Sequence, residues 1–173
     1  MNLLTQTTNK ALSAMRWSAL FLALAATFFA CGGDSATTTK NNKNNGTHVF
    51  RNANFGMSAN QVKRSESDAV ELVNDTPEKL QYTADMGEND FSDIVYHFNG
   101  ADKLIEIEFN LYFDNSDDAQ DIHAGLIQQF SSDYKSVSDN SWVGSADGTD
   151  FQVFARRSES TTRPGVYVIW QPL

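Results

Sequence analysis

Two stretches in which apolar and polar residues alternate, joined by a turn, restrict the fold of this chain of 173 residues more than any other feature. Residues 94–98 and 105–113 carry apolar side chains at every second position, and the sequence Asn-Gly-Ala-Asp at 99–102 suits a reversal between them. Alternation with a period of two predicts strands with one buried face, and the turn predicts that they pair as an antiparallel hairpin. The residues expected on the inner face are Ile94, Tyr96, Phe98, Ile105, Ile107, Phe109, Leu111 and Phe113.

A long helix is expected to follow this hairpin, from about residue 117 to residue 134. Its apolar residues recur three or four positions apart, which places them on one stripe, and aspartates in its first turn favour the positive end of the helix dipole. Because such a stripe has to be buried, the inner face of 105–113 is its expected partner. The stripe consists of Ala119, Ile122, Leu126, Phe130 and Tyr134.

Further elements complete a single domain between residues 47 and 173. Ser58, with Gln61 three positions later, forms a capping box that predicts a short helix ending at about Ser65. We therefore predict an α+β fold, in which one long and one short helix pack on an antiparallel sheet of about five to seven strands. The additional strands are expected at 69–74, 79–85, 140–145, 150–157 and 165–171.

Residues 1–30 are typical of a signal peptide. The stretch 17–30 (WSALFLALAATFFA) is almost entirely apolar and follows the positive charges of Lys10 and Arg16. At about 1.5 Å per residue it spans about 21 Å, which is short of the roughly 30 Å hydrocarbon core of a bilayer. A cleaved signal peptide is therefore favoured over a spanning helix, and translation could begin at Met15 instead of Met1.

Cys31 is the only cysteine of the chain and directly follows the apolar stretch. Residues 30–33 (ACGG) resemble the lipobox of bacterial lipoproteins, in which the cysteine is acylated before the signal peptide is removed. The phenylalanines at 28–29 depart from that pattern. The alternative is an unpaired cysteine left inside a membrane anchor. Because a lone thiol in an oxidising compartment is a liability unless it is modified, we predict lipidation of Cys31.

A polar segment, 32–46 (GGDSATTTKNNKNNG), separates this cysteine from the domain. Its composition does not bury enough apolar surface to offset the entropy of ordering, so 31–46 is interpreted as a lipidated cysteine with a flexible tether. Two or more acyl chains would hold the domain stably at a membrane. Gly32 after the cysteine implies, by the same resemblance, an outer-membrane rather than an inner-membrane location in the cell envelope.

The charge of the chain excludes some partners. The formal net charge is -9 at pH 7, and the sequence pI is about 4.6. Such a surface repels phosphates, so a nucleic-acid partner is not expected, and neither is docking onto anionic lipid through a basic face. Attachment to a membrane would have to come from the lipid on Cys31.

Sequence motifs for catalysis or metal binding are not found. His48, His97 and His123 lack the spacing of a zinc site, and hydrolase motifs such as G-x-S-x-G do not occur. Glu106 and Glu108 share one face of a predicted strand; glycosidases use pairs of carboxylates, but alternation in any half-exposed sheet produces such pairs. We therefore expect no enzyme, no catalytic residue, no metal and no cofactor.

The remaining candidate is the sheet face opposite the long helix. Aromatic residues and arginine are enriched in protein interfaces, so this mixed face is predicted to bind a protein partner. The alternative is that the helix at 58–65 or a loop covers it. The residues proposed for binding are Tyr112, Phe154, Arg156, Tyr167 and His97, with Val95, Glu106, Glu108, Gln152 and Ile169 beside them.

Two short motifs resemble a known family. Residues 55–62 (FGMSANQV) are similar to the G-M-[ST]-x-x-[QE]-V opening of small envelope lipoproteins of the SmpA/OmlA (BamE-like) family. Residues 96–100 (YHFNG), followed by Leu104, are similar to that family's Y-x-F-x-x-G-x-L element. The resemblance implies an α+β domain that works by binding, without a cofactor. The family's Leu-Gly-x-Pro after the first helix is missing, so a role in barrel assembly is not carried over.

The expected function is therefore that of a lipid-anchored cell-envelope protein that binds a protein partner or acts as a scaffold. A lipid-anchored enzyme or inhibitor with an unrecognised site is the alternative. A deep polar pocket that contains His97 and a carboxylate would favour the enzyme, whereas a shallow aromatic sheet face would favour the binding protein.

The lipid anchor is tested by metabolic labelling with a fatty-acid analogue in cells that express the wild-type chain or Cys31→Ser. Label is expected on the wild type alone, because acylation requires the Cys31 thiol. Equal label on both chains, or label on neither, would contradict the assignment of Cys31 as the lipidation site.

Overall fold

The computed structural model describes residues 45–46, 48–158, 160 and 162–173. The predicted signal peptide at 1–30, Cys31 and the tether as far as residue 44 lie outside the described residues, so lipidation stays a prediction. Among the described residues, no helix has the length and apolar character that crossing a membrane requires.

The described residues form nine strands and two helices. Strands account for most of the ordered backbone, and all nine belong to one sheet. The elements are β1 (Asn45–Gly46), α2 (Ala59–Ser65), β2 (Glu71–Thr76), β3 (Lys79–Gly87), β4 (Asp90–Phe98), β5 (Leu104–Tyr112), α3 (Ser116–Asp133), β6 (Lys135–Ser138), β7 (Ser141–Ala146), β8 (Thr149–Arg157) and β9 (Gly165–Pro172).

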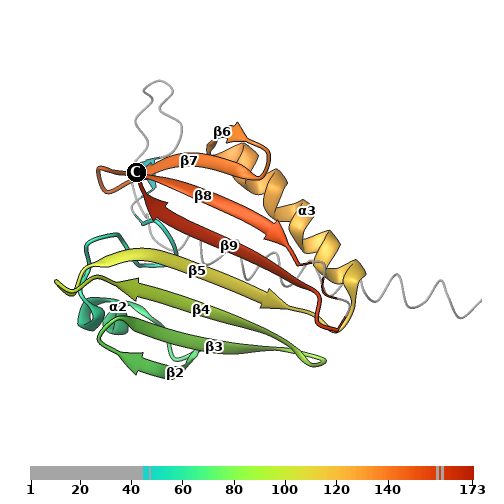
Figure 1. The fold of residues 1–173 in the computed structure, drawn as a ribbon, viewed down its shortest axis with the longest axis horizontal. Helices are drawn as coiled ribbons and strands as arrows, with labels where there is room; N and C mark the ends of the chain where they lie inside the picture. Colours follow the sequence, from blue (N-terminus) through green and yellow to red (C-terminus); the bar gives the residue numbers. More distant parts are fainter. Residues whose placement is uncertain (1–44, 47, 159, 161) are drawn as a thin grey trace, which may run out of the picture. The chain divides into compact units, whose positions relative to one another are not determined.

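The sheet is built from two antiparallel runs of strands, each preceded by a helix (Figure 1). The order across it is β1-β7-β8-β9-β5-β4-β3-β2, and β6 pairs with β7 beside β1. The first run, β2 to β5, follows α2; the second, β6 to β9, follows α3. The last strands of the two runs, β5 and β9, pair antiparallel from Ile107–Trp170 to Tyr112–Gly165 and so join the runs into one sheet.

The predicted number of strands was wrong. Eight strands pair antiparallel, and β1 adds a ninth, parallel to β7, where a sheet of five to seven had been expected. The two unpredicted strands are β1 and β6, which are short and polar and do not alternate. Their backbones are extended because they pair with the backbone N–H and C=O groups at the edge of β7. Side-chain periodicity does not predict such strands, because this pairing depends on the tertiary structure.

The inner face of the central hairpin begins one residue earlier than the alternation predicts. The register shifts between His97–Glu106 and Phe98–Leu104, which leaves Ile105 as an extra residue on β5. Leu104 is therefore buried at 1% exposure, whereas Ile105 is 41% exposed. In a β-bulge one strand carries an extra residue that has no partner, and here that residue turns outward, so the assignment of Ile105 to the core was wrong.

Helix α3 forms one layer of the core. Asn115 caps it by accepting a hydrogen bond from the Asp118 backbone N–H at 2.9 Å, and Ala119, Ile122 and Leu126 are buried, as the predicted stripe requires. The predicted partner of this helix, the inner face of 105–113, was wrong, because α3 packs mainly on β6 to β9. The ring of Phe130 lies 5.5 Å from Trp142 on β7 and 6.0 Å from Trp170 on β9.

Helix α2 and the segment before it cover the same face of the sheet. Ser58 caps α2 in a full capping box with Gln61, and Val62 is completely buried. Just after α2, Glu66 accepts a hydrogen bond from the hydroxyl of Tyr96, which points inward from β4. Upstream of α2, the ring of Phe50 packs 5.4 Å from Phe109 and 4.8 Å from Trp170, across the junction of β5 and β9.

Gly144 on β7 lies where the core has no room for a larger side chain. A Cβ at this position would lie 2.7 Å from Tyr134 Cδ1 and 2.8 Å from Phe151 Cζ, and Phe151 is itself buried. We expect Gly144→Ala to lower the free energy of unfolding by about 1–3 kcal/mol, because overpacking forces buried rings to move.

The matched control for this substitution is Gly100→Ala, since a Cβ at Gly100 would meet no atom within 4 Å. Its effect should stay within about 0.5 kcal/mol. Denaturant unfolding of both variants measures the difference, and equal stabilities would contradict the packing at Gly144.

Candidate functional site

The face of the sheet opposite the helices carries every residue predicted to bind a partner. Cross-strand pairs place them together: Tyr167 pairs with Arg156, and His97 pairs with Glu106. We call this surface the open face. Its residues on β4, β5, β8 and β9 are Phe91, Asp93, Val95, His97, Glu106, Glu108, Asn110, Tyr112, Gln152, Phe154, Arg156, Tyr167, Ile169 and Gln171.

No described element covers the open face. Helix α2 was the predicted alternative cover, but it lies on the side to which Tyr96 points, and α3 lies over the inner residues of β7 to β9. Phe154 is 36% exposed, and the side chains of Tyr112, Tyr167 and His97 are half-buried. The described part of the chain therefore leaves this surface accessible apart from Val95 and Asn110, which are buried at 7% and 8% exposure.

One end of the open face holds aromatic rings and two arginines, which we call the aromatic–arginine cluster. The rings of Phe91 and Tyr112 stack with centroids 4.6 Å apart, and Tyr112 meets Tyr167 edge-on at 6.0 Å. The guanidinium of Arg163 lies 4.9 Å from the Phe91 centroid and that of Arg156 lies 5.5 Å from the Tyr167 centroid. Such cation–π contacts hold both cations over the rings on the surface.

Two members of this cluster were missed in the sequence. Phe91 extends the alternation of Asp93, Val95 and His97 by one step, so that β4 begins earlier than the predicted strand at 94; the longer alternation was a usable signal. Arg163 precedes β9 in a loop and has no such signal. Its position over Phe91 depends on how β9 returns beside β5.

Burial also affects the chemistry of the cluster. It raises the pKa of Tyr112 above its ordinary value, and the neighbouring Tyr167 adds to the effect. The Tyr112 phenol therefore stays protonated at neutral pH and can donate a hydrogen bond to a partner.

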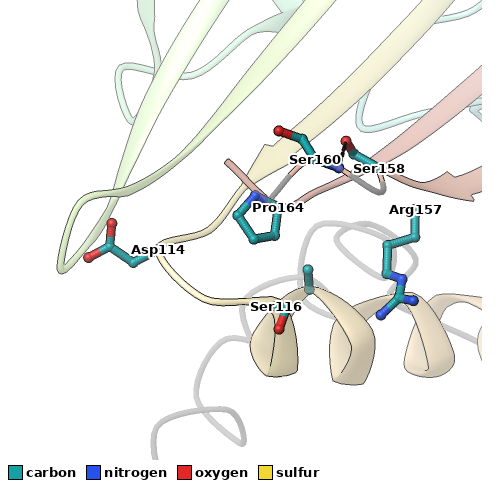
Figure 2. A pocket seen from close by; sticks show the side chains of 7 residues that line it. Asp114, Ser116, Arg157, Ser158, Ser160 and Pro164 are labelled. Atoms are coloured by element: carbon teal, nitrogen blue, oxygen red, sulfur yellow. Dashed lines mark hydrogen bonds between the residues drawn. The ribbon is translucent and has the colours of Figure 1, made fainter. Parts of the chain in front are cut away.

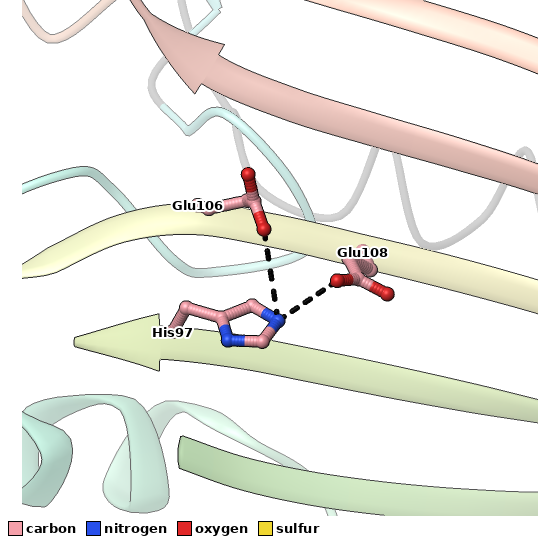
Figure 3. A group of neighbouring side chains, drawn as sticks. All are labelled: His97, Glu106 and Glu108. Carbon is pink, nitrogen blue, oxygen red and sulfur yellow. Dashed lines mark hydrogen bonds and ion pairs between the residues drawn. The ribbon is translucent and has the colours of Figure 1, made fainter. Parts of the chain in front are cut away.

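The opposite part of the open face holds His97, Glu106 and Glu108, which we call the His–Glu cluster (Figure 3). His97 Nε2 lies 2.9 Å from Glu108 Oε1 and 3.7 Å from Glu106 Oε1. Asn110 Nδ2 donates to Glu108 Oε2 at 3.2 Å, and the Gln171 amide donates to Glu106 Oε2. Each carboxylate is thus held by an amide on one oxygen and faces the imidazole with the other.

The sequence contains the information that predicts the His–Glu cluster, but only if the histidine and the two glutamates are considered together. Glu106 and Glu108 fit ordinary strand alternation, and His97 was predicted on the same sheet face as one of the partner-binding residues. Pairing across the turn at 99–102 was the signal that combines them, because the hairpin register sets His97 opposite Glu106.

The other two histidines lie away from this cluster. His48 approaches Asn54, with 3.4 Å between Nδ1 and the amide Nδ2. His123 lies on α3, where burial lowers its pKa; Arg157 lowers it further, and a backbone hydrogen bond with Ala155 acts in the opposite direction. His48 and His123 therefore contact groups other than carboxylates. Among the described residues, His97 is the only histidine that belongs to a group of three possible metal ligands.

A cavity of about 300 Å³ lies where the beginning of α3 meets the loop between β8 and β9 (Figure 2). Asp114 and Arg157 bring opposite charges to its wall, and Ser116, Ser158 and Ser160 add hydroxyls. Opposite charges give no preference for an anion or a cation. None of the residues predicted to bind a partner lines this cavity.

Comparison with protein-family models, with curated proteins and with solved structures finds no match to the chain. The resemblance to small envelope lipoproteins therefore stays a prediction that rests on the two motifs alone.

The lowered pKa of His123 predicts a pH dependence of stability. Because the folded state takes up a proton at lower pH than the unfolded state does, the stability that neutral His123 contributes is present above the unfolded pKa, near 6.5, and is lost as pH falls below it. His123→Gln should therefore lose less stability than the wild type between about pH 7.5 and pH 5. Urea unfolding at each pH measures this, and parallel stability curves would contradict the role of burial.

Proposed function

We propose that the protein is a lipid-anchored cell-envelope protein that binds a protein partner through the open face and performs no catalysis. The observation that carries the proposal is the exposure of aromatic and arginine side chains on one sheet face while both helices pack on the other. A mixed surface that exposes aromatic and arginine side chains, in a domain with its own core, is typical of an interaction site.

The composition of the open face supports protein recognition. Phe154 and Ile169 contribute accessible apolar side chains on β8 and β9, and Glu108 of β5 separates them from Val95 of β4, which is buried. The aromatic–arginine cluster lies to one side of these residues, and His97 and Glu106 lie to the other. Apolar centres flanked by charged groups match the anatomy of protein interfaces, and Tyr and Arg are enriched among the residues that dominate binding energy.

The side chains are also ordered before any partner arrives. Tyr112 and Tyr167 are held by ring contacts, and Arg156 is held over Tyr167. Side chains that are already restricted lose less conformational entropy on association, which improves affinity without any additional contact.

The enzyme alternative receives less support. His97 and its carboxylates lie on the accessible sheet face, and the cavity at the beginning of α3 contains none of them. Catalysis generally needs a concave site that excludes water from the reacting groups. The lipid on Cys31 would hold the open face near a membrane, in the outer membrane by the lipobox resemblance, where its partner would be another envelope protein.

Site-specific photocrosslinking in intact cells tests the proposal. A photoreactive amino acid at Phe154 or Tyr167 should yield one discrete crosslinked protein, because both positions lie on the open face. Tyr112→Ala should weaken that crosslink at least several-fold, since it removes the ring between Phe91 and Tyr167.

The matched control places the same photoreactive group at Gln128, an exposed position on α3. It should give no such product. Crosslinks from Gln128 alone, or no crosslink from the open face, would overturn the proposal.

A further inference from the structure

We infer that His97, Glu106 and Glu108 form a binding site for a divalent transition-metal ion such as Zn²⁺. One nitrogen and two carboxylate oxygens lie within 4.8 Å of one another in this cluster. Imidazole together with carboxylate suits zinc and its neighbours, whereas calcium and magnesium prefer oxygen donors alone.

Two of the three distances between the donor atoms are close to those of a tetrahedral site, and the third lies within 4.8 Å. Bonds of about 2.0–2.1 Å to a tetrahedral metal place the ligand atoms about 3.3 Å apart. His97 Nε2 lies 2.9 Å from one carboxylate oxygen and 3.7 Å from the other. Small side-chain rotations would therefore let all three ligands reach one ion without a change in the backbone.

The strands that carry the ligands lie inside the sheet, with a neighbouring strand on each side. β4 and β5 pair with each other along their length, and both have a further strand on the other side, β3 and β9. Glu106 and Glu108 are two positions apart on β5, and His97 stands opposite Glu106 on β4. Ligands on central strands are placed more precisely than ligands on loops, and this lowers the cost of assembling a metal site.

The hydrogen bonds around the cluster orient the carboxylates toward one point. Asn110 and Gln171 each donate to the outer oxygen of one carboxylate and leave the other oxygen directed at His97 Nε2. Hydrogen-bond donors that hold the ligands, without touching the ion themselves, fix the orientation of the ligands and raise the affinity for the metal. Because both are neutral amides, they do not compensate the negative charge of Glu106 and Glu108.

The charge balance favours a cation between these three side chains. A single Nε2–H cannot make good hydrogen bonds to two carboxylates at once. Lys79 stands opposite His97 on β3, but its ammonium is directed to Gln81 Oε1 at 3.3 Å. Among the described residues, the ion pairs of the two glutamates are with His97 alone. A dication bound to neutral His97 would offset both carboxylate charges.

The site would keep an open coordination position. The three side chains are 27% to 31% exposed, so an ion among them would face solvent on the open face. Three protein ligands leave the fourth position of a tetrahedral ion to water or to a side chain of another molecule, unlike a structural site with four protein ligands. Metal binding does not require the proposed protein partner, so the two ideas can fail separately.

Metal titration of the full chain tests the site, in a Cys31→Ser background so that the chain contains no thiol. Co²⁺ added to the metal-free protein should give visible absorption typical of tetrahedral nitrogen and oxygen ligands, saturating at one equivalent. Zn²⁺ should abolish that absorption by displacement, and calorimetry should give the same stoichiometry.

Substitution of the ligands separates this site from adventitious binding. His97→Gln and Glu108→Gln should each weaken Zn²⁺ binding at least tenfold, while His123→Gln should leave it unchanged. Circular dichroism of each variant confirms that the sheet is intact. Absence of stoichiometric binding, or equal binding by the His97→Gln, Glu108→Gln and His123→Gln chains, would overturn the site.

Discussion

The pairing of β5 with β9 is the interaction on which the rest of the structure depends. It sets Ile107 beside Trp170 and Phe109 beside Val168, and so merges the inner faces of the two runs of strands. Phe50 packs across this junction. Without the pairing each run would end in an unpaired edge, and neither helix would have a complete core beneath it.

The same pairing creates the open face, because a sheet that is continuous on its inner side is continuous on its outer side too. Tyr112 of the first run reaches Tyr167 of the second, and Gln171 of the second run reaches Glu106 of the first. The aromatic–arginine cluster therefore spans the junction of β5 and β9, and the His–Glu cluster, which lies on β4 and β5, receives a hydrogen bond across that junction from Gln171. The combination of both clusters on one surface arises because the two runs of strands pair in register through β5 and β9.

Local signals predicted the elements well where one side-chain pattern decides the outcome. The capping box at Ser58 and the stripe of α3 are examples, since helix capping and helical periodicity are properties of a few neighbouring residues. Prediction failed where the outcome depends on residues distant in the chain. β6 is a strand because β7 lies beside it, and Ile105 turns outward because a bulge adjusts the hairpin register.

The sequence by itself determined the alternation that puts His97, Tyr112, Phe154, Arg156 and Tyr167 on one face, because the side-chain period of a strand follows from its backbone geometry. It also contains the signal-peptide and lipobox-like patterns on which the expected anchor rests. Only the tertiary structure decided that β5 and β9 are neighbours, and hence that Tyr112 meets Tyr167, that Gln171 reaches Glu106 and that Arg163 covers Phe91. The physical reason is that strand order and register come from burying both helices on one shared core, and that requirement joins segments far apart in the chain.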